Sequence, residues 1–307
     1  MGTPEFAVPS LKALFEAGEE VVAVVTQPDK PKGRGKHLTA PPVKELAIKH
    51  NFSVLQPEKI NHEVFIGSIK KLLPDVIVVI AYGKILPKAI LDIPPLGCIN
   101  VHASLLPKYR GAAPINWAII NGEKETGIAT MLMDEGMDTG AILLTEKVEI
   151  KGHDTAADMY NKLKDIGAGL LVKTIKGLKS GTIIPAPQDN SQATYAPMLK
   201  KENGRIDWTT GAEGIKNLIR GLNPWPGAYT RWQGRQIKIF KGAWVGSHGS
   251  GARMEPGTVI NVSADGICVA AGKDALLITE LQPENKNKMS ASEFIKGYRI
   301  GKGQIFD

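Results

Sequence analysis

The sequence has few cysteines and no long apolar segment. Two of its 307 residues are cysteine, Cys98 and Cys268, which is too few for a disulfide framework, and they lack metal-ligand spacing. We expect both to be buried, inert thiols in a reducing compartment. No apolar run reaches the length of about 18 residues that a membrane-spanning helix needs. No charged-then-apolar leader is present either, so we expect a cytoplasmic protein without a membrane partner.

Two other absences narrow the chemistry. The six histidines show no ligand spacing, so no metal centre is expected. No Gly-x-Gly-x-x-Gly motif follows an early strand, and Gly33 and Gly35 lie in a basic segment, which argues against a dinucleotide-dependent oxidoreductase.

Aromatic residues make up only 6% of the chain. The hydrophobic content of 43% is ordinary for a globular protein, and the length favours two domains.

The first part of the chain alternates strand and helix patterns. Apolar runs rich in Val and Ile predict strands at residues 21–26, 75–81, 98–102 and 128–133. Helical patterns lie between and after them, at residues 10–17, 42–50, 64–73, 112–120 and 155–178. This alternation predicts an α/β domain over residues 1–183, with a doubly wound, mostly parallel, Rossmann-like sheet. In such sheets ligands lie beyond the carboxyl ends of the strands.

The last third of the chain has a different pattern. Residues 184–203, with Pro185 and Pro187 close together and little periodicity, indicate a linker. Short strand candidates follow at residues 236–245, 257–262, 266–271 and 275–281, with helical segments at 215–221 and 290–297. They predict a small OB-like β-barrel domain over residues 204–307. Four tryptophans lie in this domain, and such residues belong to a barrel core more often than to base-stacking platforms: Trp208, Trp225, Trp232 and Trp244.

Polar residues converge at the end of the predicted strand 98–102. Asn100 and His102 share one face because side chains alternate along a strand. Downstream, Asp138 lies between Gly136 and Gly140, which would let its backbone approach another loop. An amide donor, an imidazole and a carboxylate suit a reaction centre. A core histidine with a polar neighbour, and an aspartate that caps its own turn, are the plainer alternatives.

A short segment beside this pair offers backbone groups and an apolar wall. It fits a flat heteroaromatic ligand, although a strand-to-loop turn stopped by proline is the alternative. Its residues are Ser104, Leu105, Leu106 and Pro107.

Basic residues suggest a polyanionic partner. The net charge is +7, and residues 204–307 hold 14 Lys and Arg against 9 Asp and Glu. A solvated basic surface explains this balance equally well. The segment 29–36 carries four cations with two glycines and no large apolar residue, so we expect an exposed, mobile loop. In the second domain, Lys238 and Lys241 lie near a predicted strand, where they could contact the backbone phosphates of a nucleic acid.

Taken together, the polar set and several further segments resemble the 10-formyltetrahydrofolate-dependent formyltransferases, and the resemblance covers nearly the whole chain. More narrowly, the further segments resemble the branch of the family that formylates initiator methionyl-tRNA. They are residues 2–8 (GTPEFAV), 26–31 (TQPDKP), 33–36 (GRGK), 110–115 (RGAAPI), 205–208 (RIDW) and 223–226 (NPWP). The resemblance implies 10-formyltetrahydrofolate as donor and initiator methionyl-tRNA as acceptor. It also implies that the loop of Arg34 and Lys36 folds over the acceptor end of the tRNA.

The chemistry of formyl transfer is consistent with these residues. An amine attacks the formyl carbon, and the carbonyl oxygen becomes anionic. We expect Asn100 and His102 to reach that oxygen. Asp138 would orient His102, favour its protonated form and relay the proton that the amine loses, through a water. Neither an acylated residue nor a metal is required, and we expect a monomer.

Other functions account for less of the sequence. A non-catalytic RNA-binding module leaves the set of Asn100, His102 and Asp138 unexplained. A formyltransferase acting on glycinamide ribonucleotide would need only the first domain, whereas one acting on a sugar nucleotide could keep a related second domain. The basic loop and the basic second domain favour tRNA over both.

The beginning of the sequence is unusual for this fold. Residues 1–4 match the loop that follows a first central strand, yet no strand precedes them. A doubly wound sheet without that strand would leave backbone groups unpaired. We therefore expect the native reading frame to start upstream of Met1.

Overall fold

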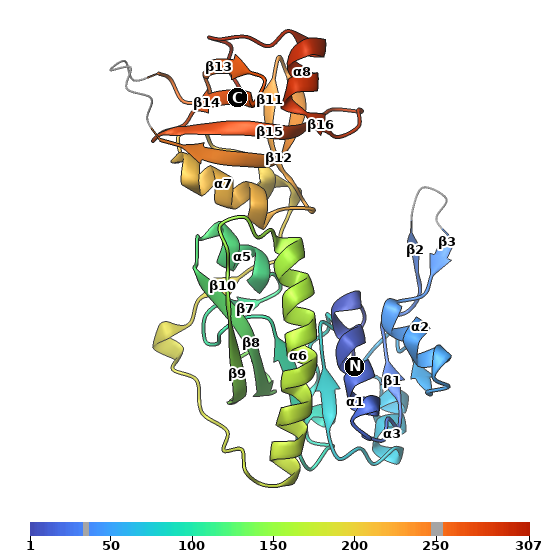
Figure 1. Ribbon diagram of the computed structural model, residues 1–307. Coiled ribbons are helices and arrows are strands. Elements are labelled where there is room, and N and C mark those ends of the chain that lie inside the picture. Colours follow the sequence, from blue (N-terminus) through green and yellow to red (C-terminus); the bar gives the residue numbers. More distant parts are fainter. Residues whose placement is uncertain (33–36, 247–253) are drawn as a thin grey trace. The chain divides into compact units, whose positions relative to one another are not determined.

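The computed structural model describes residues 1–32, 37–246 and 254–307 (Figure 1). Contacts divide the chain into two compact units. The first contains Met1–Pro114, Glu125–Glu149 and Tyr160–Ala196, and the second contains Ile115–Lys124, Ile150–Met159 and Pro197–Asp307. The predicted linker 184–203 is thus shared between the units, and the predicted boundaries at residues 183 and 204 stay a prediction.

The main sheet of the first unit has the strand order β5-β6-β8-β9. These strands are β5 (Ile77–Val79), β6 (Cys98–His102), β8 (Glu125–Leu132) and β9 (Ile142–Glu149). β5 and β6 are parallel, but β8 is antiparallel to both of its neighbours. The α/β class is confirmed, while the expectation of a mostly parallel sheet is wrong for this part. β8 and β9 are consecutive strands joined by a connection of nine residues, 133–141, which suits antiparallel pairing.

Helices hold the strands of this unit in place. α1 (Val8–Glu16) and α2 (Pro42–Lys49) each have proline in the first turn, where its missing N–H costs nothing. α3 (Glu63–Lys71) and the short α4 (Lys88–Leu91) follow. The long α6 (Ala156–Lys179) packs on β6 and β8, and a Cβ built at Gly167 would lie 3.2 Å from Val101 Cγ1. The hydroxyls of Thr174 and Thr130 bond at 2.8 Å, which fixes the helix along the sheet.

The first residues lie between two strands of the unit. β1 (Val24–Val25) pairs in parallel with β4 (Val54–Leu55). Gly2 N donates to Val25 O at 2.9 Å, and Ile80 N donates to Met1 O at 2.9 Å. A cavity of about 160 Å³ lies beside them, lined mainly by apolar residues in and around β1 and β5. The expectation of a strand before Met1 stays a prediction.

The basic segment begins in a short two-stranded sheet. β2 (Lys30–Lys32) pairs with β3 (His37–Thr39), so residues 30–32 of this segment form a strand, where we expected a loop. The residue before β2 is anchored because Lys44 Nζ contacts Asp29 Oδ2 at 2.8 Å and Gln56 Nε2 donates to Asp29 Oδ1 at 2.8 Å. Residues 33–36 lie outside the described residues.

The second unit is built on an antiparallel sheet with the order β11-β12-β15-β14-β13, and β16 pairs with β15. The strands are β11 (Ala228–Trp232), β12 (Arg235–Val245), β13 (Val259–Ser263), β14 (Gly266–Ala270), β15 (Ala275–Pro283) and β16 (Met289–Ser290). α5 (Pro114–Ile120) lies mostly in this unit, together with α7 (Ala212–Gly221) and α8 (Ala291–Tyr298). Ser290 and Glu293 cap α8 reciprocally. The predicted β-rich domain is confirmed.

The last residues of the chain connect the two edge strands of that sheet. Asp307 and Arg231 of β11 exchange backbone hydrogen bonds of 2.8 and 3.2 Å. On the other side, Val259 N of β13 donates to Gln304 O at 2.7 Å. The tail therefore closes the sheet around a core that includes Trp208 and Trp232. The other two tryptophans of this unit, Trp225 and Trp244, are more than half exposed, so the core prediction holds for only two of the four.

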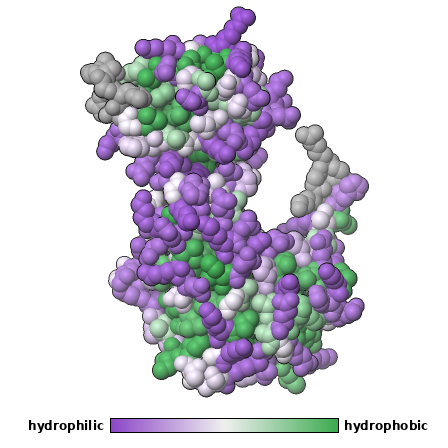
Figure 2. All heavy atoms as spheres, viewed as in Figure 1, coloured by the Kyte–Doolittle hydropathy of each residue, from purple (hydrophilic) through white to green (hydrophobic). Residues whose placement is uncertain are grey.

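The surface and the cysteines are consistent with a globular protein. In the view of Figure 2, hydrophobic residues reach the surface of the first unit between hydrophilic ones. In the ranges that the structure describes, no helix is both long and apolar enough to cross a bilayer. Both cysteines are buried as predicted, and burial raises the pKa of the Cys98 thiol to about 12.

Candidate active site

Strand β6 places two of the predicted site residues. Asn100 pairs with Val79 of β5 on one side and with Met131 of β8 on the other, and His102 pairs with Ala129 of β8. Since they are two positions apart, their side chains share a face, as the sequence predicts. His102 is 6% exposed, which removes most of the competing water from its ring.

The turn between β8 and β9 supplies the third residue. Asp138 has a φ of +55°, in the left-handed region. The turn is capped by a different acid, because Asp134 Oδ1 accepts from Gly136 N at 3.0 Å and from Thr139 Oγ1 at 2.6 Å. A Cβ at Gly140 would lie 1.8 Å from Leu132 O, so only glycine fits there. The carboxylate of Asp138 is therefore left to face the strand.

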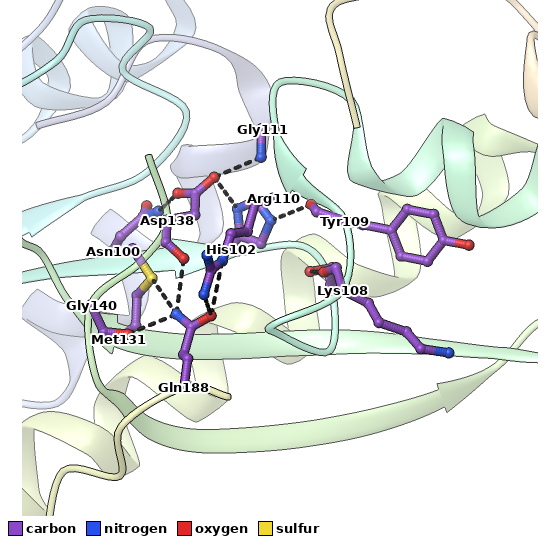
Figure 3. A network of polar contacts seen from close by, with 11 residues as sticks. Asn100, His102, Lys108, Tyr109, Arg110, Gly111, Met131, Asp138, Gly140 and Gln188 are labelled. Atoms are coloured by element: carbon purple, nitrogen blue, oxygen red, sulfur yellow. Dashed lines mark hydrogen bonds and ion pairs between the residues drawn. The ribbon is translucent and has the colours of Figure 1, made fainter. Parts of the chain in front are cut away.

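The three side chains meet in the arrangement shown in Figure 3. Asp138 Oδ2 lies 3.5 Å from His102 Nδ1, and Asp138 Oδ1 accepts from Asn100 Nδ2 at 3.2 Å. Asp138 Oδ2 also accepts from the backbone N–H of Gly111 at 2.8 Å. The expectation that the glycine frame brings Asp138 close to another loop is confirmed, and that loop is the one around Gly111.

The other nitrogen of the imidazole is also engaged. His102 Nε2 lies 2.9 Å from the carbonyl oxygen of Tyr109. Because a carbonyl oxygen can only accept, Nε2 carries a proton, and Nδ1 is the nitrogen that faces the Asp138 carboxylate. The ring can therefore take up a proton at Nδ1 without moving.

The predicted folate segment follows directly after β6. Ser104 is fully buried and its hydroxyl donates to Lys108 O at 2.6 Å, which closes the turn. Leu106 packs in a small cluster with Ala129 and Met131. Leu105 and Pro107 are partly buried. An apolar wall beside the polar set is thus present.

Three residues that support the backbone of Asp138 were not predicted from the sequence. Arg110 is 2% exposed, and its guanidinium donates to the side-chain oxygens of Gln188 at 2.7 Å and Asn190 at 2.8 Å. Gln188 in turn donates to the backbone oxygens of Asp138 and Gly140. Arg110 lies in a segment that carried the family resemblance, whereas Gln188 and Asn190 lie in the region interpreted as a linker. No local pattern marks those two residues.

The family profile described as formyl transferase matches residues 1–175, and the profile of the formyl transferase C-terminal domain matches residues 198–299. A protein named methionyl-tRNA formyltransferase from Caldanaerobacter subterraneus subsp. tengcongensis is 55% identical over 306 residues, which cover 99% of this chain and 98% of that protein. One of the same name from Acetivibrio thermocellus is 52% identical and covers 99% and 97%. The chain belongs to the methionyl-tRNA formyltransferase family.

Solved structures of other proteins share the fold. An N-formyltransferase from Helicobacter canadensis, in complex with folinic acid and dTDP-3-aminofucose, aligns with a TM-score of 0.65 at 20% identity, over 94% of this chain and 97% of that one. HypX from Aquifex aeolicus, in complex with tetrahydrofolic acid, aligns with a TM-score of 0.59 at 16% identity, over 84% and 44%. At these identities the likeness shows the fold alone.

The residues predicted to bind tRNA belong to both units of the chain. Arg34 and Lys36 lie outside the described residues. Lys238 is partly buried on β12, and Lys241 is exposed on the same strand, where its Nζ lies 3.5 Å from Glu280 Oε2. In the described part of the chain, no group of three or more His, Cys, Asp and Glu residues converges as a metal site would require.

Proposed function

We infer that this chain transfers the formyl group of 10-formyltetrahydrofolate to the α-amino group of methionine on initiator methionyl-tRNA. The product would be N-formylmethionyl-tRNA, which serves translation initiation. The observation that carries this proposal is the full-length similarity to methionyl-tRNA formyltransferases in a chain that brings Asn100, His102 and Asp138 together at the end of β6. A donor amide, an imidazole and a carboxylate are the groups that acyl transfer to an amine requires.

Asn100 supplies a hydrogen bond to the reacting carbonyl. One N–H of its amide is donated to Asp138 Oδ1 at 3.2 Å, which fixes the orientation of the amide. The second N–H is left for the formyl oxygen, where negative charge develops as the amine attacks. A donor that is already oriented stabilises that charge without reorganisation, and one such donor contributes about 2.7–4 kcal/mol.

His102 and Asp138 handle the proton. When the α-amino nitrogen bonds to the formyl carbon, the proton that it loses passes to the pair formed by His102 Nδ1 and Asp138 Oδ2. The folate nitrogen takes up a proton as its bond to the formyl carbon breaks. Protonated at Nδ1, His102 would also help to stabilise the formyl oxygen through its charge.

The turn after β6 is the proposed place for the donor. Ser104, Leu105, Leu106 and Pro107 combine a buried hydroxyl, apolar side chains and backbone groups next to the polar set. A flat ring with a polar edge needs this mixture.

The proposed tRNA contacts come from both units. Arg34 and Lys36, which lie between β2 and β3 in the sequence, would contact the acceptor end, and Lys238 and Lys241 would contact backbone phosphates from β12. We also propose that the protein acts as a cytoplasmic monomer, which size-exclusion chromatography with light scattering would test.

The direct experiment supplies the donor and one acceptor at a time. Initiator methionyl-tRNA, uncharged tRNA and a small primary amine are each incubated with 10-formyltetrahydrofolate and the protein. Formylation of the charged tRNA alone supports the proposal, and formylation of the small amine alone contradicts it.

A further inference from the structure

The stretch from Ala186 to Thr194 lies far along the chain from Asn100 and His102, but it forms hydrogen bonds close to the candidate active site. Arg110 N donates to Thr194 O at 2.9 Å, and Tyr109 N donates to Thr194 Oγ1 at 2.9 Å. Ala186 exchanges two backbone hydrogen bonds of 2.8 Å with Ile142, the first residue of β9. The stretch from Ala186 to Thr194 is therefore held at one end by β9, just after the Asp138 turn, and at the other end by the backbone of residues 109 and 110.

Gln188 lies in this stretch, and both the oxygen and the nitrogen of its side-chain amide form hydrogen bonds. Its Oε1 accepts from Arg110 Nε at 3.1 Å and from the terminal guanidinium nitrogen at 2.7 Å. Its Nε2 donates to Asp138 O at 2.8 Å and to Gly140 O at 2.7 Å. Figure 3 shows the side chain between the guanidinium and the turn.

The chemistry of the partners fixes the orientation of this amide. Arginine has only donors and backbone carbonyls only accept, so the oxygen must face Arg110 and the nitrogen must face the turn. Arg110 is buried, and its guanidinium bonds to the neutral amides of Gln188 and Asn190. A buried cation on Oε1 polarises the amide and strengthens the hydrogen bonds that Nε2 donates.

The turn needs such support because its conformation is unfavourable. Asp138 adopts a φ of +55°, in the left-handed region that residues other than glycine seldom take. Its backbone carbonyl is held by Gln188, while its carboxylate contacts Asn100, His102 and Gly111. The two ends of Asp138 are thus fixed by different groups.

We propose that Gln188, backed by Arg110, is a positioning residue that holds the Asp138 turn so that the carboxylate reaches His102 and Asn100. The proposal rests on the proposed formyl transfer. Gln188 itself touches neither substrate in this account and acts through the backbone of Asp138 and Gly140.

The substitution Gln188→Glu separates positioning from folding. A glutamate keeps the oxygen that faces Arg110 and neutralises the buried cation, but it presents a second oxygen to the carbonyls of Asp138 and Gly140. Residues 134–137 of that turn are exposed, so we expect the turn to shift with only a small effect on the core. We expect kcat to fall at least about tenfold, the factor of one lost hydrogen bond. KM for each substrate should stay within about twofold and Tm within about 4 °C of wild type.

A second variant covers the case in which the glutamate destabilises the protein. Arg110→Met combined with Gln188→Met removes the buried charge and its partner together, which restores an apolar interior but leaves the turn without its donors. The positioning role predicts a near-normal Tm with kcat still low. The matched control is Gln192→Glu, because Gln192 lies four residues away and its side chain donates to the exposed Asp189, at 2.8 Å.

The outcomes are distinct. Wild-type kcat within about twofold in Gln188→Glu, or recovery of kcat together with Tm in the double methionine variant, overturns the positioning role. An inactive wild-type protein would instead count against the proposed formyl transfer.

Discussion

Asp138 Oδ2 lies 3.5 Å from His102 Nδ1, while the opposite ring nitrogen of His102 lies 2.9 Å from Tyr109 O. Both nitrogens of one buried imidazole therefore face oxygen acceptors. The ring is oriented by the carbonyl of Tyr109 and can hold a second proton next to the carboxylate. This relationship makes the pair, and not His102 alone, the unit that would handle the proton during transfer.

Replacement of Asn100 tests the hydrogen bond proposed to the formyl oxygen. Asn100→Asp keeps the shape but faces Asp138 Oδ1 with an oxygen and loses both N–H donors. We expect kcat to fall about 10²–10³-fold, as for other lost oxyanion donors. Single-turnover formylation measures the chemical step, and thermal unfolding is the control. Unchanged single-turnover rates would rule out the oxyanion role.

Asp138 should be equally sensitive to loss of charge. Asp138→Asn can still accept from Gly111 N, so the turn is retained, but its neutral amide no longer stabilises a protonated His102. We expect a loss of about 10²–10⁴-fold in kcat, the range for positioned acid–base groups. Rates are measured across pH, with Asp134→Asn as a control in the same turn. An Asp134 variant as impaired as the Asp138 variant would indicate that only the fold of the turn matters.

Part of the site could be predicted because a local sequence pattern marks strand β6. The run of Cys98, Ile99 and Val101 defines the buried strand, and period-two alternation then places Asn100 and His102 together. Strands β9 and β11 were missed, although β9 alternates partly buried and exposed residues from Leu144 to Glu149, a signal that sequence inspection can detect. Gln188 had no such signal. Its role depends on a distant turn meeting a buried arginine, which only tertiary structure brings about.

The two lysines on β12 give a salt-dependent prediction. Replacing Lys238 and Lys241 by alanine should raise KM for methionyl-tRNA and leave kcat within about twofold. The slope of log KM against log salt should fall by about 0.7–0.9 for each phosphate that the variant no longer neutralises. Lys147→Ala is the control, because Lys147 is also exposed and paired with a glutamate of the adjacent strand, Glu125. Equal effects of both changes would indicate a general charge effect.

The central claim is that one site, formed by Asn100, His102 and Asp138, transfers a formyl group to methionine held on tRNA. The most direct measurement is a competition in one reaction, with 10-formyltetrahydrofolate, initiator methionyl-tRNA and an amino-sugar nucleotide present together, for wild type and Asn100→Asp. We predict rapid formylation of the tRNA alone by wild type and a loss of about 10²–10³-fold in the variant. Formylation of the sugar nucleotide in preference to the tRNA, or equal rates for both proteins, would contradict the account.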